Sequence, residues 1–281
     1  MHYDKNYSTI DEYYPKEKRG GNMRIVIKVG TSTLAHAGGR LNIRRVETLC
    51  KVISDLKNAG HAIVMVSSGA IGMGVGKLGL PGRPAEMEGK QAAAAVGQCE
   101  LMYTYDRLFS QYHHVVAQLL LTAEDIQDAR RSRHVHDTLE QLLRWNALPI
   151  INENDAVATD EIGIQTTIGE NDSLSAIVAK LTGADLLVLL SDIDGLYTAD
   201  PRQHPEATMI PVVEHITPEI EALAGGAGTS MGTGGMATKL RAAKLVVDAG
   251  IDMVILNGER PEGLYDLFDG KPIGTRFVGK R

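Results

Sequence analysis

Short runs of apolar residues, many of them β-branched, alternate along the chain with longer stretches in which apolar positions have helical spacing. The short runs predict strands at residues 24–29, 62–66, 115–120, 148–151, 186–190, 253–256 and 275–278. The periodic stretches predict helices at residues 43–59, from about 69, and at 87–111, 123–145, 173–181, 235–249 and 261–268. Because the strand runs are continuous rather than alternating, they fit a sheet covered by helices on both faces. The alternation of strands and helices therefore predicts a layered α/β fold with a mostly parallel sheet.

The domain organisation follows from the same pattern. The chain has 281 residues, and residues 23–281 contain neither an internal repeat nor a linker, so we expect one domain with at most two lobes. Residues 1–22 are polar and rich in tyrosine and lack the apolar segment of a secretory signal. We expect them to form a flexible arm in front of the fold.

Composition and charge exclude several classes of protein. The formal net charge of −6 argues against nucleic acid as the main partner, because phosphate backbones attract clustered Lys and Arg. One basic cluster, residues 130–134, is flanked by acidic residues and is typical of a solvated helix face. No apolar run has the length needed to span a membrane. Cys50 and Cys99 fall within helical patterns, and we expect buried, reduced thiols in a cytoplasmic protein.

Candidate chemistry is concentrated after the strands, because ligands of such sheets bind beyond the carboxyl ends of the strands. After the first strand, Lys28 and Gly30 can hold an anion through an ammonium group and a close backbone approach; a plain turn is the alternative. After the second, Ser68 and Gly69 open a helix whose free N–H groups attract phosphate or carboxylate, unless the serine is only an N-cap. The pattern Gly-x-Gly-x-x-Gly at residues 74–79 lies too far beyond the strand to be a dinucleotide fingerprint.

Two clusters of acids and amides flank a Gly- and Thr-rich stretch, at residues 152–155 and 169–172. Their carboxylates can orient an amino group or position lysines, and their amides can bind a carboxylate and an ammonium group at once. The alternative is turn and cap chemistry, in which Asp172 is the N-cap of the helix at residues 173–181.

The segments at residues 191–201 and 225–239 suggest a nucleotide. The first contains Asp-Gly and Asp-Pro and predicts a hairpin-like excursion, which either covers an adenosine or is an ordinary surface hairpin. The second runs through many glycines into a helix with Lys239 one turn in; it is not a Walker A loop, but it has the parts that bind phosphates. A flexible linker is the alternative.

Five motifs together resemble the glutamate 5-kinases of the amino acid kinase superfamily. They are IKVGTS at residues 27–32, SSGAI at 67–71, INENDAV at 151–157, GLYTADP at 195–201 and GTGGMATK at 232–239. The resemblance covers residues 23–281 and implies a three-layer αβα sandwich with an amino-acid-binding N-terminal part and a nucleotide-binding C-terminal part. Many family members carry a C-terminal PUA domain, which we do not expect here. Glu170 replaces the Asp of the family's Gly-Asp-Asn-Asp motif.

The resemblance also implies the reaction and the residues that perform it. The reaction is phosphorylation of the γ-carboxylate of L-glutamate by ATP with Mg²⁺, the first step of proline biosynthesis. The implied catalytic residues are Lys28, Lys239 and Asp172; the substrate-binding residues are Ser68, Gly69, Asn152, Asp155 and Asn171; the ATP-binding residues are Lys28, Gly30, Ser191, Asp192, Thr233, Gly234, Gly235, Met236, Ala237, Thr238 and Lys239. No side chain is assigned as a metal ligand.

The implied partners are proline as a feedback inhibitor, a glutamyl phosphate reductase and further copies of the chain. Two other functions stay open. The first is a kinase of the same fold for another acid such as N-acetylglutamate, against which Asp155 argues, since an acetylated nitrogen carries no charge. The second is a non-catalytic amino-acid sensor, against which the retention of Lys28, Lys239 and Asp172 argues.

Overall fold

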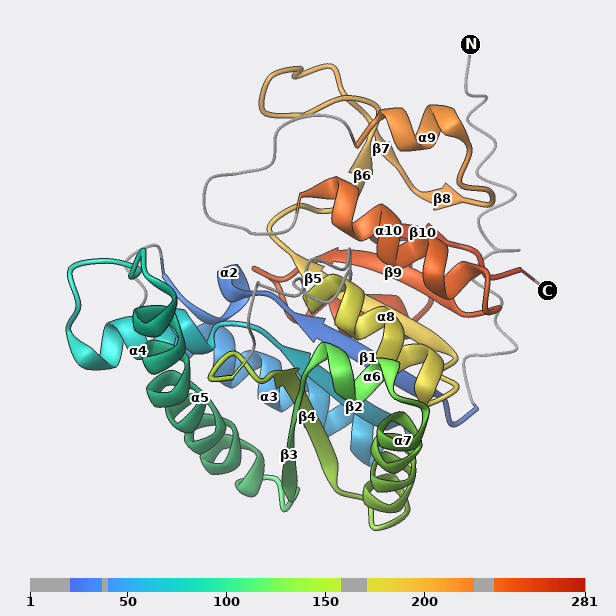
Figure 1. Ribbon diagram of the computed structural model, residues 1–281. Helices are drawn as coiled ribbons and strands as arrows, with labels where there is room; N and C mark the ends of the chain where they lie inside the picture. Colours follow the sequence, from blue (N-terminus) through green and yellow to red (C-terminus); the bar gives the residue numbers. More distant parts are fainter. Residues whose placement is uncertain (1–20, 37–39, 158–170, 225–234, 281) are drawn as a thin grey trace.

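The structure, a computed structural model, describes residues 21–36, 40–157, 171–224 and 235–280 (Figure 1). The strands are β1 (Arg24–Val29), β2 (Ala62–Ser67), β3 (Val116–Leu121), β4 (Leu148–Glu153), β5 (Leu186–Ser191), β6 (Leu196–Tyr197), β7 (Met209–Ile210), β8 (Val212–Val213), β9 (Asp252–Asn257) and β10 (Thr275–Phe277). The helices are α2 (Thr31–Leu34), α3 (Ile43–Asn58), α4 (Ala70–Leu78), α5 (Met87–Ser110), α6 (Ala123–Gln127), α7 (Ala129–Arg144), α8 (Asn171–Leu181), α9 (Pro218–Ala222), α10 (Met236–Val247) and α11 (Gly263–Phe268).

Eight of the strands form one sheet in the order β3-β4-β2-β1-β5-β9-β10-β8. Neighbouring strands are parallel throughout, except that β10 runs antiparallel to β9. The predicted mostly parallel α/β sheet is therefore confirmed. Because β1, β2, β4, β5 and β9 are parallel neighbours, their carboxyl ends and the segments that follow them meet at one edge of the sheet.

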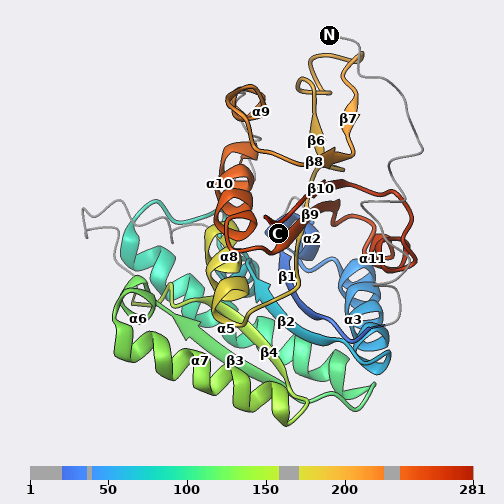
Figure 2. The ribbon, with the colours of Figure 1, turned by 90° about the vertical axis from the view of Figure 1, so that its right-hand side faces the viewer.

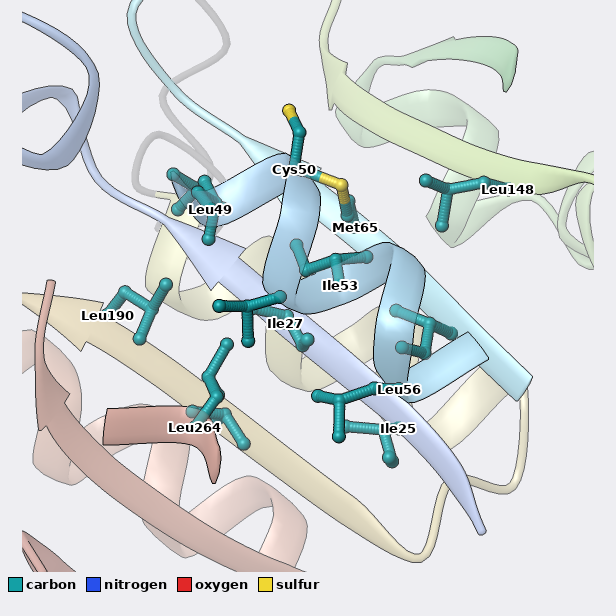
Figure 3. Close-up of a cluster of buried hydrophobic side chains, with 14 of the residues drawn as sticks. Ile25, Ile27, Leu49, Cys50, Ile53, Leu56, Met65, Leu148, Leu190 and Leu264 are labelled. Atoms are coloured by element: carbon teal, nitrogen blue, oxygen red, sulfur yellow. The ribbon is translucent and has the colours of Figure 1, made fainter. Parts of the chain in front are cut away.

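Helices cover both faces of the sheet and make three layers (Figure 2). Alternate residues of β1 enter different cores: Ile25 and Ile27 pack with α3, α5 and α11, whereas Val26 packs with α7, α8 and α10. Figure 3 shows Leu49 and Ile53 of α3 lying over Ile25 and Ile27 in the first core. Burial on both faces explains why β1 lacks the polar alternation of a half-exposed strand.

The helices α4 and α5 pack tightly against each other, and both contribute residues to the cavity at the carboxyl ends of the strands. A Cβ atom at Gly74 would lie 1.8 Å from the carbonyl oxygen of Ala93, and one at Gly97 would lie 1.8 Å from that of Ala70. Only glycine fits at these two positions, since real Cβ atoms do not approach backbone so closely. Gly74, the first glycine of the pattern at residues 74–79, therefore serves helix packing, and Gly79 ends α4 as its C-cap residue, consistent with the rejection of the pattern as a dinucleotide fingerprint.

The prediction of one helix at residues 123–145 is wrong. Asp128 has an extended backbone and separates α6 from α7, and its carboxylate accepts hydrogen bonds from the backbone N–H groups of Arg130 and Arg131. Asp128 is thus the N-cap of a new helix, a role that Asp favours over a helix interior. The basic cluster on α7 is solvent-exposed, as expected for Arg130, Arg131 and Arg133.

Other differences are confined to short elements and one side chain. The strand β8 and the short helices α2 and α9 were not predicted, while the hairpin after β5 is confirmed by the antiparallel pair β6–β7. Cys50 is buried, but Cys99 is exposed, contrary to expectation. Of the expected N-terminal arm, residues 1–20 lie outside the described residues. None of the helices that the structure describes is both long and apolar enough to cross a membrane.

Candidate active site

A carboxylate held between two lysines lies at the carboxyl edge of the sheet. Asp172 is in the first turn of α8 and is 2% exposed. Its Oδ1 lies 2.8 Å from Nζ of Lys28 on β1, and its Oδ2 lies 3.1 Å from Nζ of Lys239 on α10. The three predicted catalytic residues therefore meet, although they come from distant parts of the sequence.

The environment keeps Asp172 ionised. Burial of the carboxyl acts to raise its pKa, but the ammonium groups of Lys28 and Lys239 and a hydrogen bond from Thr238 outweigh it and lower the pKa to about 2. Thr238 donates its hydroxyl to Oδ2 at 2.7 Å. With both oxygens engaged, Asp172 is a fixed anion that positions two cations, rather than a base that accepts protons.

Asp172 is not an N-cap, contrary to one of the alternatives drawn from the sequence. The helix α8 begins at Asn171, and the carboxylate of Asp172 contacts Lys28, Thr238 and Lys239. Ion pairs with the largely buried Lys28 and the buried Lys239 are available only in the folded chain. They engage the carboxylate that would otherwise be free to cap the helix.

The beginning of α10 adds uncapped N–H groups beside Lys239. Gly235 is the N-cap residue, with an extended backbone, and no side chain caps the helix within the described part of the chain. Met236 and Ala237 follow in the first turn, with Thr238 and Lys239. Such a helix end carries a partial positive charge and attracts anions.

Gly30 keeps the space next to Lys28 narrow but open. A Cβ atom there would lie 3.3 Å from the carbonyl oxygen of Leu190 and 3.5 Å from Nζ of Lys28. The position brings the end of β1 against the end of β5, where Ser191 and Asp192 follow. Ser191 is buried and donates its hydroxyl to Asp192 at 3.2 Å, and Asp192 pairs with Arg202 at 3.4 Å.

A chain of amides runs next to the ion cluster. Asn171 donates through Nδ2 to the hydroxyl of Ser68 at 2.7 Å and to Oδ1 of Asn152 at 3.2 Å. Asn152 in turn donates through its own Nδ2 to Oε1 of Gln98 at 2.9 Å. Three predicted substrate-binding residues therefore contact one another, and Asn171 is the sequence neighbour of Asp172.

The turn that carries Ser68 is fixed by a glycine and a buried tyrosine. Gly69 has φ 99°, a left-handed conformation that glycine adopts without strain. Ser67 lies 2.9 Å from the hydroxyl of Tyr105, which is fully buried on α5. Burial is the main cause that raises the pKa of Tyr105, so its hydroxyl stays protonated and holds the turn as a neutral group.

Asp155 lines a cavity of about 440 Å³ between α5 and the ends of β3 and β4. Burial raises the pKa of the Asp155 carboxyl, and the nearby charge of Arg83 partly opposes this shift. Glu153 and Gln98 line the same cavity. The walls thus combine acids with amides, which suits a ligand that carries both an ammonium group and a carboxylate.

Parts of the predicted nucleotide site lie outside the described residues, namely Thr233, Gly234 and the glycines before them, as does Glu170. The sequence reasoning missed Gln98 and Tyr105, which contact the predicted residues from α5. A lone Gln or Tyr inside a helical pattern gave no signal, because only the tertiary fold brings α5 to the strand ends.

Comparison with known proteins shows the family of the chain. Residues 23–257 match the amino acid kinase family. A glutamate 5-kinase of Clostridium perfringens is 53% identical over 92% of this chain and 96% of its own length. One from Listeria monocytogenes is 50% identical over 95% of this chain and 96% of its own length.

Two solved structures share the fold. Carbamate kinase from Giardia lamblia bound to AMP-PNP has a TM-score of 0.65 at 17% identity, covering 93% of this chain and all of that one. UMP kinase from Bacillus anthracis has a TM-score of 0.59 at 15% identity, covering 92% of this chain and 97% of that one. At such identities they support the fold alone. The sequence identity to the curated relatives is decisive: the chain belongs to the amino acid kinase family and, within it, to the glutamate 5-kinases.

Proposed function

We infer that the chain transfers the γ-phosphoryl group of ATP to the side-chain carboxylate of L-glutamate, giving ADP and L-glutamyl 5-phosphate. The observation that carries this inference is the identity of about half of the residues to glutamate 5-kinases over nearly the whole chain. The acceptor carboxylate has a pKa of about 4.3 and is ionised at neutral pH, so the reaction needs no general base. Catalysis then depends on alignment of the two substrates and on neutralising charge.

Lys28 and Lys239 are our candidates for the charge-neutralising groups. Their ammonium groups contact the buried Asp172, and Lys239 stands in the first turn of α10. Negative charge accumulates on the transferring phosphoryl group and the β-phosphate, and fixed cations stabilise it without reorganising. Asp172 is a positioning residue in this scheme, because it holds both lysines without touching the phosphates. Gly30, Ser191, Asp192 and the residues that lead into α10 complete the proposed ATP site.

Mg²⁺ fits this site as an ion carried by ATP. Among the described residues there is no group of three His, Cys, Asp or Glu side chains that could hold a metal, and both oxygens of Asp172 are engaged. Mg²⁺ is commonly bound by phosphate oxygens and water with few protein ligands. The ion would neutralise phosphate charge, and the chain's own contribution is the two lysines and the end of α10.

The glutamate end of the site is assigned to Asp155 and to the amide chain. Asp155 would pair with the ammonium group of the substrate from the cavity between α5 and the strand ends. Ser68, Asn152 and Asn171, linked by hydrogen bonds, would guide the side chain toward Lys28, with Gly69 supplying a backbone N–H group. N-acetylglutamate offers no charge to Asp155, so we do not expect it as a substrate.

The product is an acyl phosphate, the activated intermediate with which proline biosynthesis begins. Acyl phosphates hydrolyse readily, so we propose transfer to a glutamyl phosphate reductase. Proline shares the α-amino and α-carboxylate groups of glutamate and is the proposed feedback inhibitor. We also propose that the chain acts as a homo-oligomer in the cytoplasm.

One assay tests the proposal. The protein is incubated with ATP, Mg²⁺ and hydroxylamine, and with one candidate acid at a time, and hydroxamate formation is measured. Glutamate should yield hydroxamate and N-acetylglutamate should not. Equal rates with both acids would contradict the substrate assignment, and no hydroxamate with any acid would favour the amino-acid sensor.

A further inference from the structure

We propose that Gln98 determines substrate specificity by donating a hydrogen bond from its side-chain amide to the α-carboxylate of the substrate. This inference rests on the proposed function and adds to it a residue on α5, a helix to which the sequence motifs assign no role.

The burial and contacts of Gln98 are unusual for a glutamine on a helix. Gln98 is only 8% exposed, and it lines the same cavity as Asp155. Its Oε1 accepts a hydrogen bond from Nδ2 of Asn152 at 2.9 Å. Its Nε2 makes no hydrogen bond to any residue that the structure describes, so two donors remain at the cavity wall.

In the structure, the orientation of the neighbouring amides determines which end of Gln98 is left for a ligand. Oδ1 of Asn152 accepts from Asn171, so Nδ2 of Asn152 is the group that faces Gln98. A donor at that place requires the oxygen of Gln98, which leaves the amide nitrogen for a ligand. The chain from Ser68 through Asn171 and Asn152 therefore acts as a support that presents a donor.

The rest of the cavity lining offers few other side chains that could bind the α-carboxylate. Its lining contains Glu153 and Asp155, and no Lys or Arg side chain among the described residues. The amides that line it are those of Gln98, Gln118 and Asn154, and Gln118 is exposed. Gln98 is thus the donor that is both buried and held by a partner.

The covalent structure of glutamate brings its α-carboxylate to this wall. The ammonium group and the α-carboxylate are bonded to the same carbon, so a substrate whose ammonium group pairs with Asp155 carries its α-carboxylate into the same cavity. The γ-carboxylate then extends toward Lys28, and Gln98 binds the α-carboxylate, which remains in the cavity.

The test exchanges the donor for an acceptor and compares two substrates. In Gln98→Glu, the new carboxylate can still accept from Asn152, but it repels the α-carboxylate of glutamate. Isoglutamine keeps the γ-carboxylate and has an uncharged α-amide, whose N–H can donate to the new carboxylate. We expect the KM for glutamate to rise about 10- to 100-fold, the range for a lost hydrogen bond to a charged group, and the KM for isoglutamine to rise far less. The ratio of the two KM values should therefore shift by at least about tenfold.

Three comparisons keep the test decisive. Gln111→Glu makes the same change at the exposed end of α5 and should leave the ratio of KM values unaltered. Gln98→Met keeps the length without the donor; it should lose preference for glutamate over isoglutamine, and it replaces the charged variant if that variant does not fold. A ratio equal to that of the unmodified protein in both folded variants would overturn the proposal. A failure of the unmodified protein to phosphorylate glutamate would instead overturn the proposed function.

Discussion

Lys28 and Lys239 contact opposite oxygens of one buried carboxylate, at 2.8 Å and 3.1 Å, although Lys28 lies on β1 and Lys239 on α10, more than 200 residues later in the sequence. The shared partner, Asp172, sits between them at the start of α8. The cationic site therefore forms only when the central strand and two helices of one face have packed together. The positions of the two ammonium groups therefore depend on the packing of α8 and α10 against β1.

Replacement of Lys239 should mainly affect turnover. We expect Lys239→Ala to lower kcat by roughly 10²–10³-fold, the typical effect of removing one group that stabilises transition-state charge. The KM for glutamate should change little, because the cavity that Asp155 lines is a separate part of the site. Steady-state kinetics in both substrates measure the two effects.

A second lysine of α10 supplies the control. Lys244 is half-exposed and pairs with Glu221, so Lys244→Ala makes the same chemical change on the same helix outside the site. Its kcat should stay within about twofold of the unmodified value. A folded Lys239→Ala variant with full activity would remove this residue from catalysis.

Replacement of Asp172 should weaken the fold in a pH-dependent way. Removing one partner of a buried ion pair costs about 3–5 kcal/mol, so Asp172→Asn should be less stable than the unmodified chain at pH 7. The pKa of Asp172 is lowered from 3.8 to about 2 in the folded chain, so its stabilising effect is present above about pH 4 and is lost as the pH falls toward 2. The difference in free energy of unfolding between the two proteins should therefore shrink between about pH 5 and pH 2. Urea unfolding across this range measures it, and a difference that does not vary with pH would contradict the role of the carboxylate.

The strands and the strand-end motifs were predictable because their signals are local. β1 and β5 are uninterrupted apolar runs, and Lys28 follows directly from its place near the end of β1. The break at Asp128 was not predictable, because apolar spacing continues from α6 into α7 while one carboxylate starts a new helix. β8 has only two residues and is defined by its pairing with β10. No local sequence pattern predicts that pairing.

The role of a site residue could be predicted where a sequence motif contains the residue, but not where the role depends on a contact made only in the folded chain. Asp172 precedes a helical pattern, so a cap was a reasonable expectation; its contact with Lys28 and Lys239 depends on the packing of α8 and α10 on β1. Gln98 is one polar residue on a long helix, and its link to Asn152 exists only because α5 crosses the strand ends.

The two cysteines should differ sharply in reactivity. Cys50 is buried, and burial raises the pKa of its thiol, whereas Cys99 is exposed and lines the cavity of Asp155. Iodoacetamide should therefore modify Cys99 in the folded protein and Cys50 only after unfolding. Saturating glutamate should slow the modification of Cys99 if the substrate fills this cavity. Mass spectrometry of digested protein gives both rates, and a rate for Cys99 that glutamate leaves unchanged would place the substrate elsewhere.

Finally, Asp155→Asn should raise the KM for glutamate far more than that for ATP. The substrate carries one ammonium group, and Asp155 is a partly buried carboxylate on the wall of the cavity. Asn keeps the shape and removes the charge, so an ion pair becomes a neutral hydrogen bond. Loss of one partner of a buried charged pair costs about 2–5 kcal/mol, and the isosteric change should lie toward the lower end. Asp106→Asn, an exposed change on α5, is the control and should leave both KM values unaltered.

The pH dependence of the same variant separates recognition of charge from a role in the turn. Burial raises the pKa of Asp155, so kcat/KM for glutamate should fall on acidification at a higher pH than an ordinary aspartate would give. The contribution of Asp155 to this limb should be absent in Asp155→Asn, which keeps only the protonation of the substrate's own γ-carboxylate, with a pKa of about 4.3. If Asp155 only shapes the turn after β4, the variant should instead lose stability and keep both the KM for glutamate and the acidic limb. Inhibition by proline should weaken together with glutamate binding if the two amino acids share the carboxylate, and intact inhibition beside lost glutamate affinity would indicate two separate sites.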